Sequence, residues 1–254
     1  MHLLVVLLLA SLAQAEDPDL ARLFARRGLT GTLVLTSLDG SRTFIHNDAR
    51  AAERFIAAST FKIPNTLIGI EEKAVDLDSR FPWDGVERPF PGHNRDQTLE
   101  SAFQVSCLWC YQIIARRVGA AKYPEYIRRM AYGQLREPFD GTEFWLDGSL
   151  TISAQEQIAF LRNLVQRKLP FSPRSYDILA RIMVADSPPG YTLRAKTGWS
   201  GGPHPQVGWY VGTVETPKEV WLFALNIVVR SPDDLPLRAT LVREALTLKG
   251  ILPK

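Results

Sequence analysis

The chain has 254 residues, of which 46% are hydrophobic and 22% are charged, and this balance excludes a disordered or fibrous protein. Thirty basic and 27 acidic residues give a formal net charge of +3. No basic run exceeds two residues, and aromatic residues do not alternate with basic ones, so the sequence argues against a nucleic-acid partner. The length suits one large domain or two interleaved lobes with a sizeable core.

The first fifteen residues are predicted to be a signal peptide. An apolar run from Leu3 to Ala10 is followed by Ala13-Gln14-Ala15, a pattern of small residues typical of a cleavage site. The run is shorter than the roughly 20 residues that a membrane anchor needs, and no cysteine directly follows Ala15 to carry a lipid. We therefore expect cleavage after Ala15 and a mature chain in the periplasm or outside the cell, with no membrane association.

The predicted strands fall near both ends of the chain. Two β-rich runs flank Asp39-Gly40 within residues 30–47, which predicts a hairpin. Three further strands are predicted near the C-terminus, at 191–200, 207–215 and 219–229.

The middle of the chain, from Ser59 to about Met183, is predicted to be mostly helical, apart from a loop rich in proline and glycine. One helix has a clear start, because Ser153 and Glu156 form an S-x-x-E capping box ahead of an apolar run. An amphipathic segment at 235–248 predicts a last helix.

This order of elements predicts an α/β fold of the α+β type. An antiparallel sheet built from both termini would be flanked by helices, with an inserted, mostly helical lobe. We expect a single domain over 16–254, in which the sheet lobe comprises about 16–57 and 188–254 and the helical lobe about 58–187.

The two cysteines, Cys107 and Cys110, are spaced C-x-x-C within a helical pattern. A redox motif would require a thioredoxin-like strand before it, and none is predicted, so we favour buried structural thiols over a redox site. The four histidines show no metal-ligand spacing, and no phosphate-binding glycine loop is present. We therefore predict neither a metal nor a nucleotide cofactor.

A serine and a lysine share one helical turn in the segment AASTFKIPN at 57–65. On a helix, residues three apart lie on one face, so Ser59 Oγ and Lys62 Nζ can approach hydrogen-bond distance. A serine becomes a nucleophile when a base takes its proton, and a lysine acts as a base when burial keeps it neutral. The alternative is an ordinary helix cap at Ser59 beside a solvated Lys62.

A second motif, Lys196-Thr197-Gly198, follows on a predicted strand. The ordered pair S-x-x-K and K-T-G marks β-lactamases and penicillin-binding proteins. Lys196 can place positive charge beside the nucleophile, and Thr197 can hydrogen-bond a substrate carboxylate. Gly198 lets a ligand lie close to the strand.

With these two motifs the sequence resembles the class D, or OXA-type, serine β-lactamases over nearly all of the mature chain. The shared segments are STFKIPNTLIGIE, FPWDGVERPFPGHNRDQTL, FWLDGSLTISAQEQIAFL, AKTGW, GWYVG and LPLR.

The resemblance implies a role for each matching residue. Ser59 would be the acylated nucleophile, and Lys62 would be carboxylated by carbon dioxide and act as the general base. Trp145 would hydrogen-bond this carboxylated lysine, and Ser106 would lie near the leaving nitrogen of the substrate.

The resemblance also implies how the substrate is held. Backbone N–H groups of Ser59 and Trp199 would form an oxyanion hole. Arg238 and Thr197 would bind the carboxylate of a small β-lactam. Taken without the resemblance, Trp145 would be an ordinary core residue and Arg238 a solvated or capping charge on the last helix.

Two elements depart from the family pattern. Its S-x-V element is Ser106-Cys107-Leu108 here, so a larger side chain replaces valine near Lys62. Its Tyr-Gly-Asn element is Tyr132-Gly133-Gln134 here. Because neither change touches Ser59, we expect activity to survive.

Three functions fit these motifs. The first is a secreted hydrolase that opens β-lactam rings and confers resistance. The second is a penicillin-sensor domain that stays acylated, and the third is a cell-wall transpeptidase or carboxypeptidase. Turnover of a β-lactam separates the first from the second, and hydrolysis of a D-Ala-D-Ala peptide identifies the third. Substrate preference, oligomeric state, the effect of Leu108 and Gln134, and the redox state of Cys107 and Cys110 stay open.

Overall fold

The computed structural model describes residues 16–202 and 205–253, so the predicted signal peptide lies outside the described residues. Its centre is a six-stranded antiparallel sheet in the order β2-β1-β11-β10-β9-β8. The strands are β1 (Gly31–Ser37), β2 (Thr43–His46), β8 (Val184–Asp186), β9 (Thr192–Trp199), β10 (Gln206–Glu215) and β11 (Val220–Val229).

The sheet joins the two ends of the chain, as the sequence predicts. Gly31 of β1 lies opposite Ile227 of β11, and Ser37 lies opposite Trp221. The β1–β2 hairpin turns at Asp39-Gly40, where Gly40 has a φ of +79° that glycine adopts readily. The hairpin and the three C-terminal strands are therefore confirmed.

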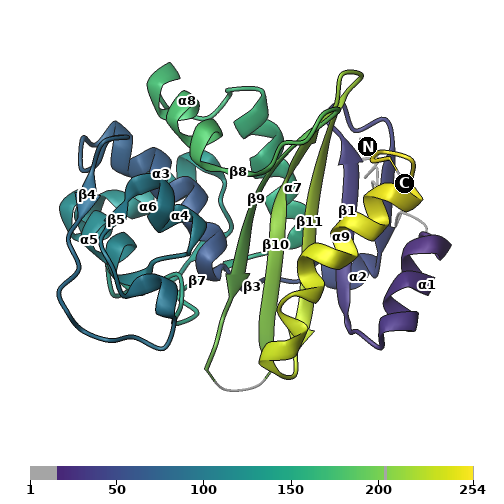
Figure 1. Cartoon of the computed structure of the whole chain (residues 1–254), viewed down its shortest axis with the longest axis horizontal. Coiled ribbons are helices and arrows are strands. Elements are labelled where there is room, and N and C mark those ends of the chain that lie inside the picture. Colours follow the sequence, from purple (N-terminus) through teal and green to yellow (C-terminus); the bar gives the residue numbers. More distant parts are fainter. Residues whose placement is uncertain (1–15, 203–204, 254) are drawn as a thin grey trace, which may run out of the picture.

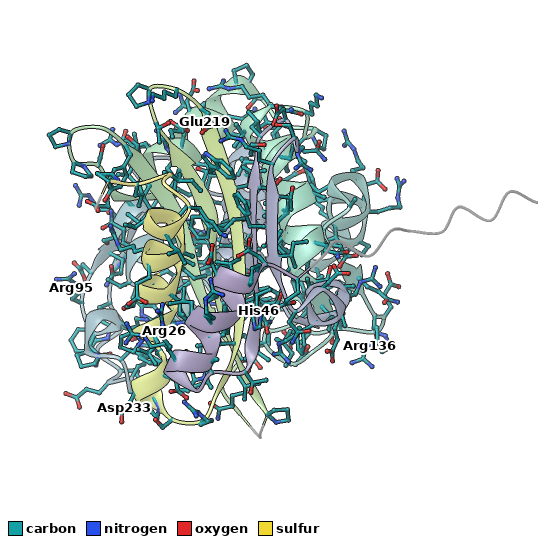
Figure 2. The ribbon with its side chains drawn as sticks, turned by 90° about the vertical axis from the view of Figure 1, so that its right-hand side faces the viewer. Arg26, His46, Arg95, Arg136, Glu219 and Asp233 are labelled. Atoms are coloured by element: carbon teal, nitrogen blue, oxygen red, sulfur yellow. A yellow bond between two sulfur atoms is a disulfide. The ribbon has the colours of Figure 1, made fainter. Side chains whose placement is uncertain are left out.

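One face of the sheet is covered by two helices, α1 (Pro18–Arg27) and α9 (Leu237–Leu248) (Figure 1). Figure 2 looks onto this face, with α1 and α9 in front of the strands and Arg26 on the outer side of α1. Leu20, Leu23 and Phe24 of α1 pack into a core with residues of β11 and α9. The predicted C-terminal helix is confirmed.

The other face of the sheet packs against the helical part of the chain, which lies to the left in Figure 1. The capping box predicted at Ser153 and Glu156 is confirmed as the start of α7. The helices are α2 (Asp48–Ala52), α3 (Lys62–Glu71), α4 (Leu99–Gln104), α5 (Leu108–Val118), α6 (Tyr123–Met130), α7 (Ala154–Val165) and α8 (Pro173–Ile182).

Several short elements in this region were not predicted. Two small sheets are built from β3 (Phe55–Ile56), β7 (Leu150–Ile152) and β6 (Gln134–Leu135), and from β4 (Arg80–Phe81) and β5 (Gln97–Thr98). The 3₁₀ helices are η1 (Ala58–Phe61), η2 (Pro91–His93), η3 (Ala120–Lys122) and η4 (Pro232–Asp234). Strands of two or three residues depend on tertiary packing, which a periodic pattern does not reveal.

The structure corrects the prediction for the two cysteines. Cys107 and Cys110 are fully buried, as expected, but they form a disulfide and are not free thiols. Their Cα atoms lie 5.4 Å apart, because the motif spans the first turn of α5, and this separation permits the bond.

No helix among the described residues is both long and apolar enough to cross a membrane.

Candidate active site

The serine and lysine of the S-x-x-K motif lie where η1 runs into α3. Lys62 Nζ donates a hydrogen bond to Ser59 Oγ at 3.0 Å. Ser59 is inside η1 and does not cap α3, whose N-cap position is Phe61, without a side-chain cap. Lys62 is 1% exposed and so is not a solvated charge. The alternative of a helix cap beside a bystander lysine is therefore wrong.

The backbone before Ser59 is held in an unusual conformation. Ala58 has a φ of +49°, a left-handed conformation that costs a non-glycine residue about 1–2 kcal/mol. Two hydrogen bonds fix it there: Ala58 N–H donates to the Trp145 carbonyl at 2.8 Å, and Ala57 N–H donates to the Leu150 carbonyl at 3.1 Å. The segment that carries Trp145 therefore also orients the serine.

Lys62 is buried, and no carboxylate of the described part of the chain pairs with it. Its Nζ contacts Ser59 Oγ and lies 5.1 Å from the ring centre of Tyr111. Burial lowers the pKa of Lys62 to about 7, so a large share of the amine is neutral near neutral pH. An uncharged amine can accept a proton or react as a nucleophile.

Two buried polar atoms near this pair have no hydrogen-bond partner among the described residues. They are Trp145 Nε1 and Ser106 Oγ. The Trp145 ring stacks on Phe61, with ring centres 5.7 Å apart, which places the indole beside η1. Buried polar groups are nearly always paired, so each of these atoms indicates a missing partner.

The K-T-G motif lies on β9, next to η1. Lys196 Nζ donates to the Thr197 carbonyl at 3.1 Å and to Thr197 Oγ1 at 3.3 Å. Burial, followed by the charges of Lys62 and Arg238, holds the pKa of Lys196 well below its usual range. A Cβ on Gly198 would lie 3.3 Å from the Thr60 nitrogen, so glycine allows β9 to approach η1 closely.

The backbone N–H of Trp199 faces away from the neighbouring strand. Ser200 N–H donates to the Val207 carbonyl of the β10 side at 3.0 Å. In an antiparallel ladder successive residues point their N–H groups to opposite sides, so that of Trp199 points away from β10. The N–H of Ser59, in the first turn of η1, has no carbonyl of that helix to donate to.

Arg238 comes from α9 and reaches the end of β9. Its Nη1 donates to the Gly198 carbonyl at 2.6 Å and its Nε to the Leu235 carbonyl at 2.7 Å. Burial lowers the pKa of Arg238 to about 10, and no carboxylate among the described residues pairs with it. Arg238 is therefore a half-buried cation available to an anionic ligand.

Ser59, Ser106, the segment 197–199 and Arg238 line one cavity of about 400 Å³. Lys62, Trp145 and Lys196 are not among its lining residues. Most of its wall is apolar, although His93 and Ser200 add polar groups. At one aromatic edge the rings of Phe90 and Trp199 lie at 85° to each other, with ring centres 6.3 Å apart. The lining residues are Ser59, Phe90, His93, Val105, Ser106, Leu108, Leu146, Thr197, Gly198, Trp199, Ser200, Gly201, Leu235 and Arg238.

A second cavity, of about 250 Å³, lies between α7, α8 and β9 and has a different character. The charged groups in its wall are paired: Arg194 with Glu215 at 2.6 Å, and Arg167 with Asp177 at 2.5 Å. The first cavity combines the Ser59 hydroxyl with the guanidinium of Arg238, which has no carboxylate partner among the described residues, and we therefore take it as the candidate active site.

Sequence reasoning missed His93 and Phe90, and left the two departures from the family pattern open. The loop that contains both was part of the resemblance, but no residue type in it specifies a role. Leu108 lines the cavity, as its position suggested. Gln134 is exposed in β6, where its Oε1 accepts a hydrogen bond from Arg54 at 2.9 Å, outside the cavity.

The chain is similar to known proteins over most of its length. A family described as the penicillin-binding protein transpeptidase domain matches residues 32–247. The chain is 38% identical over 242 residues to β-lactamase OXA-20 of Pseudomonas aeruginosa, covering 94% of this chain and 90% of the relative. It is also 38% identical over 231 residues to β-lactamase OXA-48 of Klebsiella pneumoniae, covering 91% and 87%.

Two solved structures are similar to this chain in fold and in sequence. The class D β-lactamase YbXI from Nostoc superposes with a TM-score of 0.89 at 37% identity, covering 92% of this chain and 99% of that one. The class D β-lactamase FUS-1 (OXA-85) from Fusobacterium nucleatum gives a TM-score of 0.90 at 33% identity, covering 94% and 100%.

Proposed function

The chain belongs to the class D β-lactamase family, and from this premise we propose that it hydrolyses the β-lactam amide of penicillin-type antibiotics and so confers resistance to them. The observation that carries the proposal is the 3.0 Å hydrogen bond between Ser59 Oγ and Lys62 Nζ. Lys62 is buried, and no acidic side chain of the described residues pairs with it, so its pKa is lowered to about 7. We propose that the mature enzyme acts in the periplasm or outside the cell, after cleavage at Ala15.

The reaction would proceed through an acyl-enzyme. Ser59 Oγ attacks the lactam carbonyl as its proton passes to the base at Lys62, and the ring C–N bond then breaks. Ser106 lines the cavity with an Oγ that has no partner among the described residues, and it would pass a proton to the leaving nitrogen. Water then cleaves the ester and frees Ser59.

Lys62 fits carboxylation by carbon dioxide. Its neutral Nζ would add to the carbon of carbon dioxide, forming an N–C bond and releasing a proton. The carboxyl group so attached supplies an anionic oxygen as general base for acylation and deacylation. The unpartnered Trp145 Nε1 is the donor expected beside such an oxygen, because it otherwise costs free energy as a buried unpaired group.

Two further groups would hold the substrate. The N–H groups of Ser59 and Trp199, both without intrahelical or ladder acceptors, would donate to the oxygen that becomes negative during attack. Arg238 and Thr197 would bind the substrate carboxylate through charge-assisted hydrogen bonds. The apolar wall around them suits the body of a small β-lactam.

Intact-protein mass spectrometry with a penicillin tests the proposal. We expect the wild-type chain to turn over many equivalents, and Ser59→Ala to acquire no mass and to hydrolyse nothing. Ser200→Ala is the matched control, because Ser200 is a serine of the same cavity without a lysine partner. A mass increase of one β-lactam on Ser59→Ala would refute the assignment. A single equivalent of ring opening by the wild type would indicate a sensor instead.

A further inference from the structure

The disulfide closes the first turn of α5, next to the active site. It joins Cys107, the N-cap residue of α5, to Cys110 in the first turn, and Cys107 Sγ also accepts a hydrogen bond from Cys110 N–H at 3.3 Å. Both cysteines are fully buried. In the chain-entropy account a disulfide stabilises more as its loop lengthens, so a bridge over two intervening residues contributes little to global stability. Its position therefore calls for a local explanation.

Ser106 precedes this turn in a conformation that needs support. Its φ is +62°, in the left-handed region that serine rarely adopts, and its Oγ is buried without a partner among the described residues. Leu108, on the other side of Cys107, lines the active-site cavity. The disulfide thus holds Cys107, which lies between Ser106 and Leu108 in the chain.

Hydrogen bonds hold the turn on its other sides. His93 Nε2 lies 3.0 Å from the Val105 carbonyl, and because a carbonyl can only accept, the hydrogen is on Nε2. Trp109 Nε1 donates to the His93 carbonyl at 3.0 Å. Cys107 N–H donates to the Ala102 carbonyl at 2.8 Å. These bonds fix residues on both sides of Ser106, and the disulfide supplies the covalent constraint between them.

We propose that the Cys107–Cys110 disulfide is a positioning element for catalysis, which keeps Ser106 in its left-handed conformation at the cavity it shares with Ser59. The cysteines themselves do not line the cavity and are positioning residues, not catalytic ones. This inference rests on the role of Ser106 in the proposed function. Without the cross-link the first turn of α5 can fray, and Ser106 can relax to an ordinary φ that withdraws its hydroxyl.

Two single variants separate the cross-link from the helix cap. Cys107→Ser removes the disulfide and keeps an acceptor at the N-cap position, where serine is favourable. Cys110→Ala removes the disulfide and keeps Cys107 Sγ as the cap. We expect both to slow acylation of Ser59 by a penicillin by the same factor, roughly fivefold to thirtyfold, as relief of left-handed strain allows. Ile114→Val, a smaller buried change in the same helix, is the control and should not slow acylation.

A double-mutant cycle then distinguishes positioning from general loosening. In a Ser106→Ala background, Cys110→Ala should cause no further loss, because the residue that it positions is already gone. The same fold-loss in both backgrounds, or no loss in the wild-type background, would overturn the proposal.

Two readouts do not depend on hydrolysis, so they separate failure of this inference from failure of the proposed function. The wild-type chain, denatured without reductant, should take up no alkylating reagent at its two cysteines. Amide hydrogen exchange over residues 105–110 should be faster in Cys107→Ser and Cys110→Ala than in Ile114→Val. Alkylation at both cysteines, or unchanged exchange, overturns the positioning role even if the chain proves inactive.

Discussion

A half-buried lysine on one face of the sheet and two buried lysines on the other have opposite surroundings. On the face covered by α1 and α9, Lys249 Nζ donates to Asp17 at 2.7 Å and to Asp19 at 2.9 Å. On the face that carries the candidate active site, Lys62 and Lys196 are more deeply buried, and neither has a carboxylate within ion-pair distance among the described residues.

The pKa values of these lysines differ because only Lys249 has carboxylate partners among the described residues. Burial alone would lower the pKa of Lys249, but its hydrogen bonds to Asp17 and Asp19 outweigh burial and raise it above the usual value. Burial without such partners lowers the pKa of Lys62 to about 7. The paired lysine therefore ties the C-terminal end of α9 to the start of α1, whereas the unpaired lysine keeps a reactive amine at a cost in stability.

The strongest test of this contrast removes the unpaired amine. Lys62→Ala should lower the rate of penicillin turnover about a hundredfold to ten-thousandfold, the usual contribution of a general base. Because the same base would activate the hydrolytic water, deacylation should slow more than acylation, and an acyl-enzyme on Ser59 should accumulate. Stopped-flow kinetics and mass spectrometry measure both steps. Full turnover by Lys62→Ala would exclude Lys62 as the base.

The next prediction concerns the unpaired guanidinium of Arg238. Arg238→Ala should raise KM for a penicillin about tenfold to a hundredfold, because a charge-assisted contact to the substrate carboxylate exists in the ground and transition states alike. Arg238→Lys keeps the charge but loses the planar guanidinium, so its KM should lie between those of the wild type and Arg238→Ala.

Arg243 provides the matched control on the same helix. It pairs with Asp186 at 2.6 Å and donates to Tyr191 at 2.9 Å, outside the cavity. Arg243→Ala should leave KM unchanged. An unchanged kcat/KM in Arg238→Ala would mean that Arg238 serves only to hold the Gly198 carbonyl.

The sequence predicts those features of the molecule that depend on residues close together in the chain. The hairpin at Asp39-Gly40, the capping box of α7 and the two candidate catalytic motifs, S-x-x-K and K-T-G, follow from residues close together in the chain. The Ser59–Lys62 contact is predictable because three residues make one helical turn.

Other features depend on contacts between distant segments. The positive φ of Ala58 is held by hydrogen bonds to residues 145 and 150, and nothing in the local sequence indicates it. The bond between Cys107 and Cys110 was missed because a helical C-x-x-C pattern does not specify a redox state. The edge strand β8 has only three residues and falls within the predicted helical lobe.

A third prediction uses the lowered pKa of Lys62. Only the neutral amine reacts with carbon dioxide, and the neutral fraction falls as pH falls through about 7. In degassed buffer, activity should therefore decline below that pH, and added bicarbonate should restore it several-fold by mass action. Steady-state rates with and without bicarbonate, from pH 5.5 to 8, measure the effect. A pH profile insensitive to bicarbonate would argue against carboxylation.

The smallest effect is expected on stability, where the two lysines should respond with opposite signs. Lys249→Met removes the cation beside Asp17 and leaves Asp19 with Arg22 alone, so it should lower the free energy of unfolding by about 1–3 kcal/mol, with little change in activity. Lys62→Met replaces a buried unpaired amine with an apolar side chain of similar length, so it should raise the free energy of unfolding while activity is lost. Urea denaturation of the two variants and the wild type measures both changes.

The pH dependence of these variants sharpens the comparison. The pKa of Lys249 is raised in the folded state, so its contribution is fully present below the unfolded value and is lost as pH rises through the folded one. The wild type should therefore have a larger free energy of unfolding than Lys249→Met at all but strongly alkaline pH.

The pKa of Lys62 is lowered in the folded state, so the unfolded state binds more protons between about pH 7 and the ordinary lysine pKa. Lys62 therefore lowers the free energy of unfolding most below pH 7 and less as pH rises. The increase in the free energy of unfolding expected for Lys62→Met should become smaller over the same range. Equal effects of pH on both variants would mean that the carboxylate partners do not distinguish the two lysines.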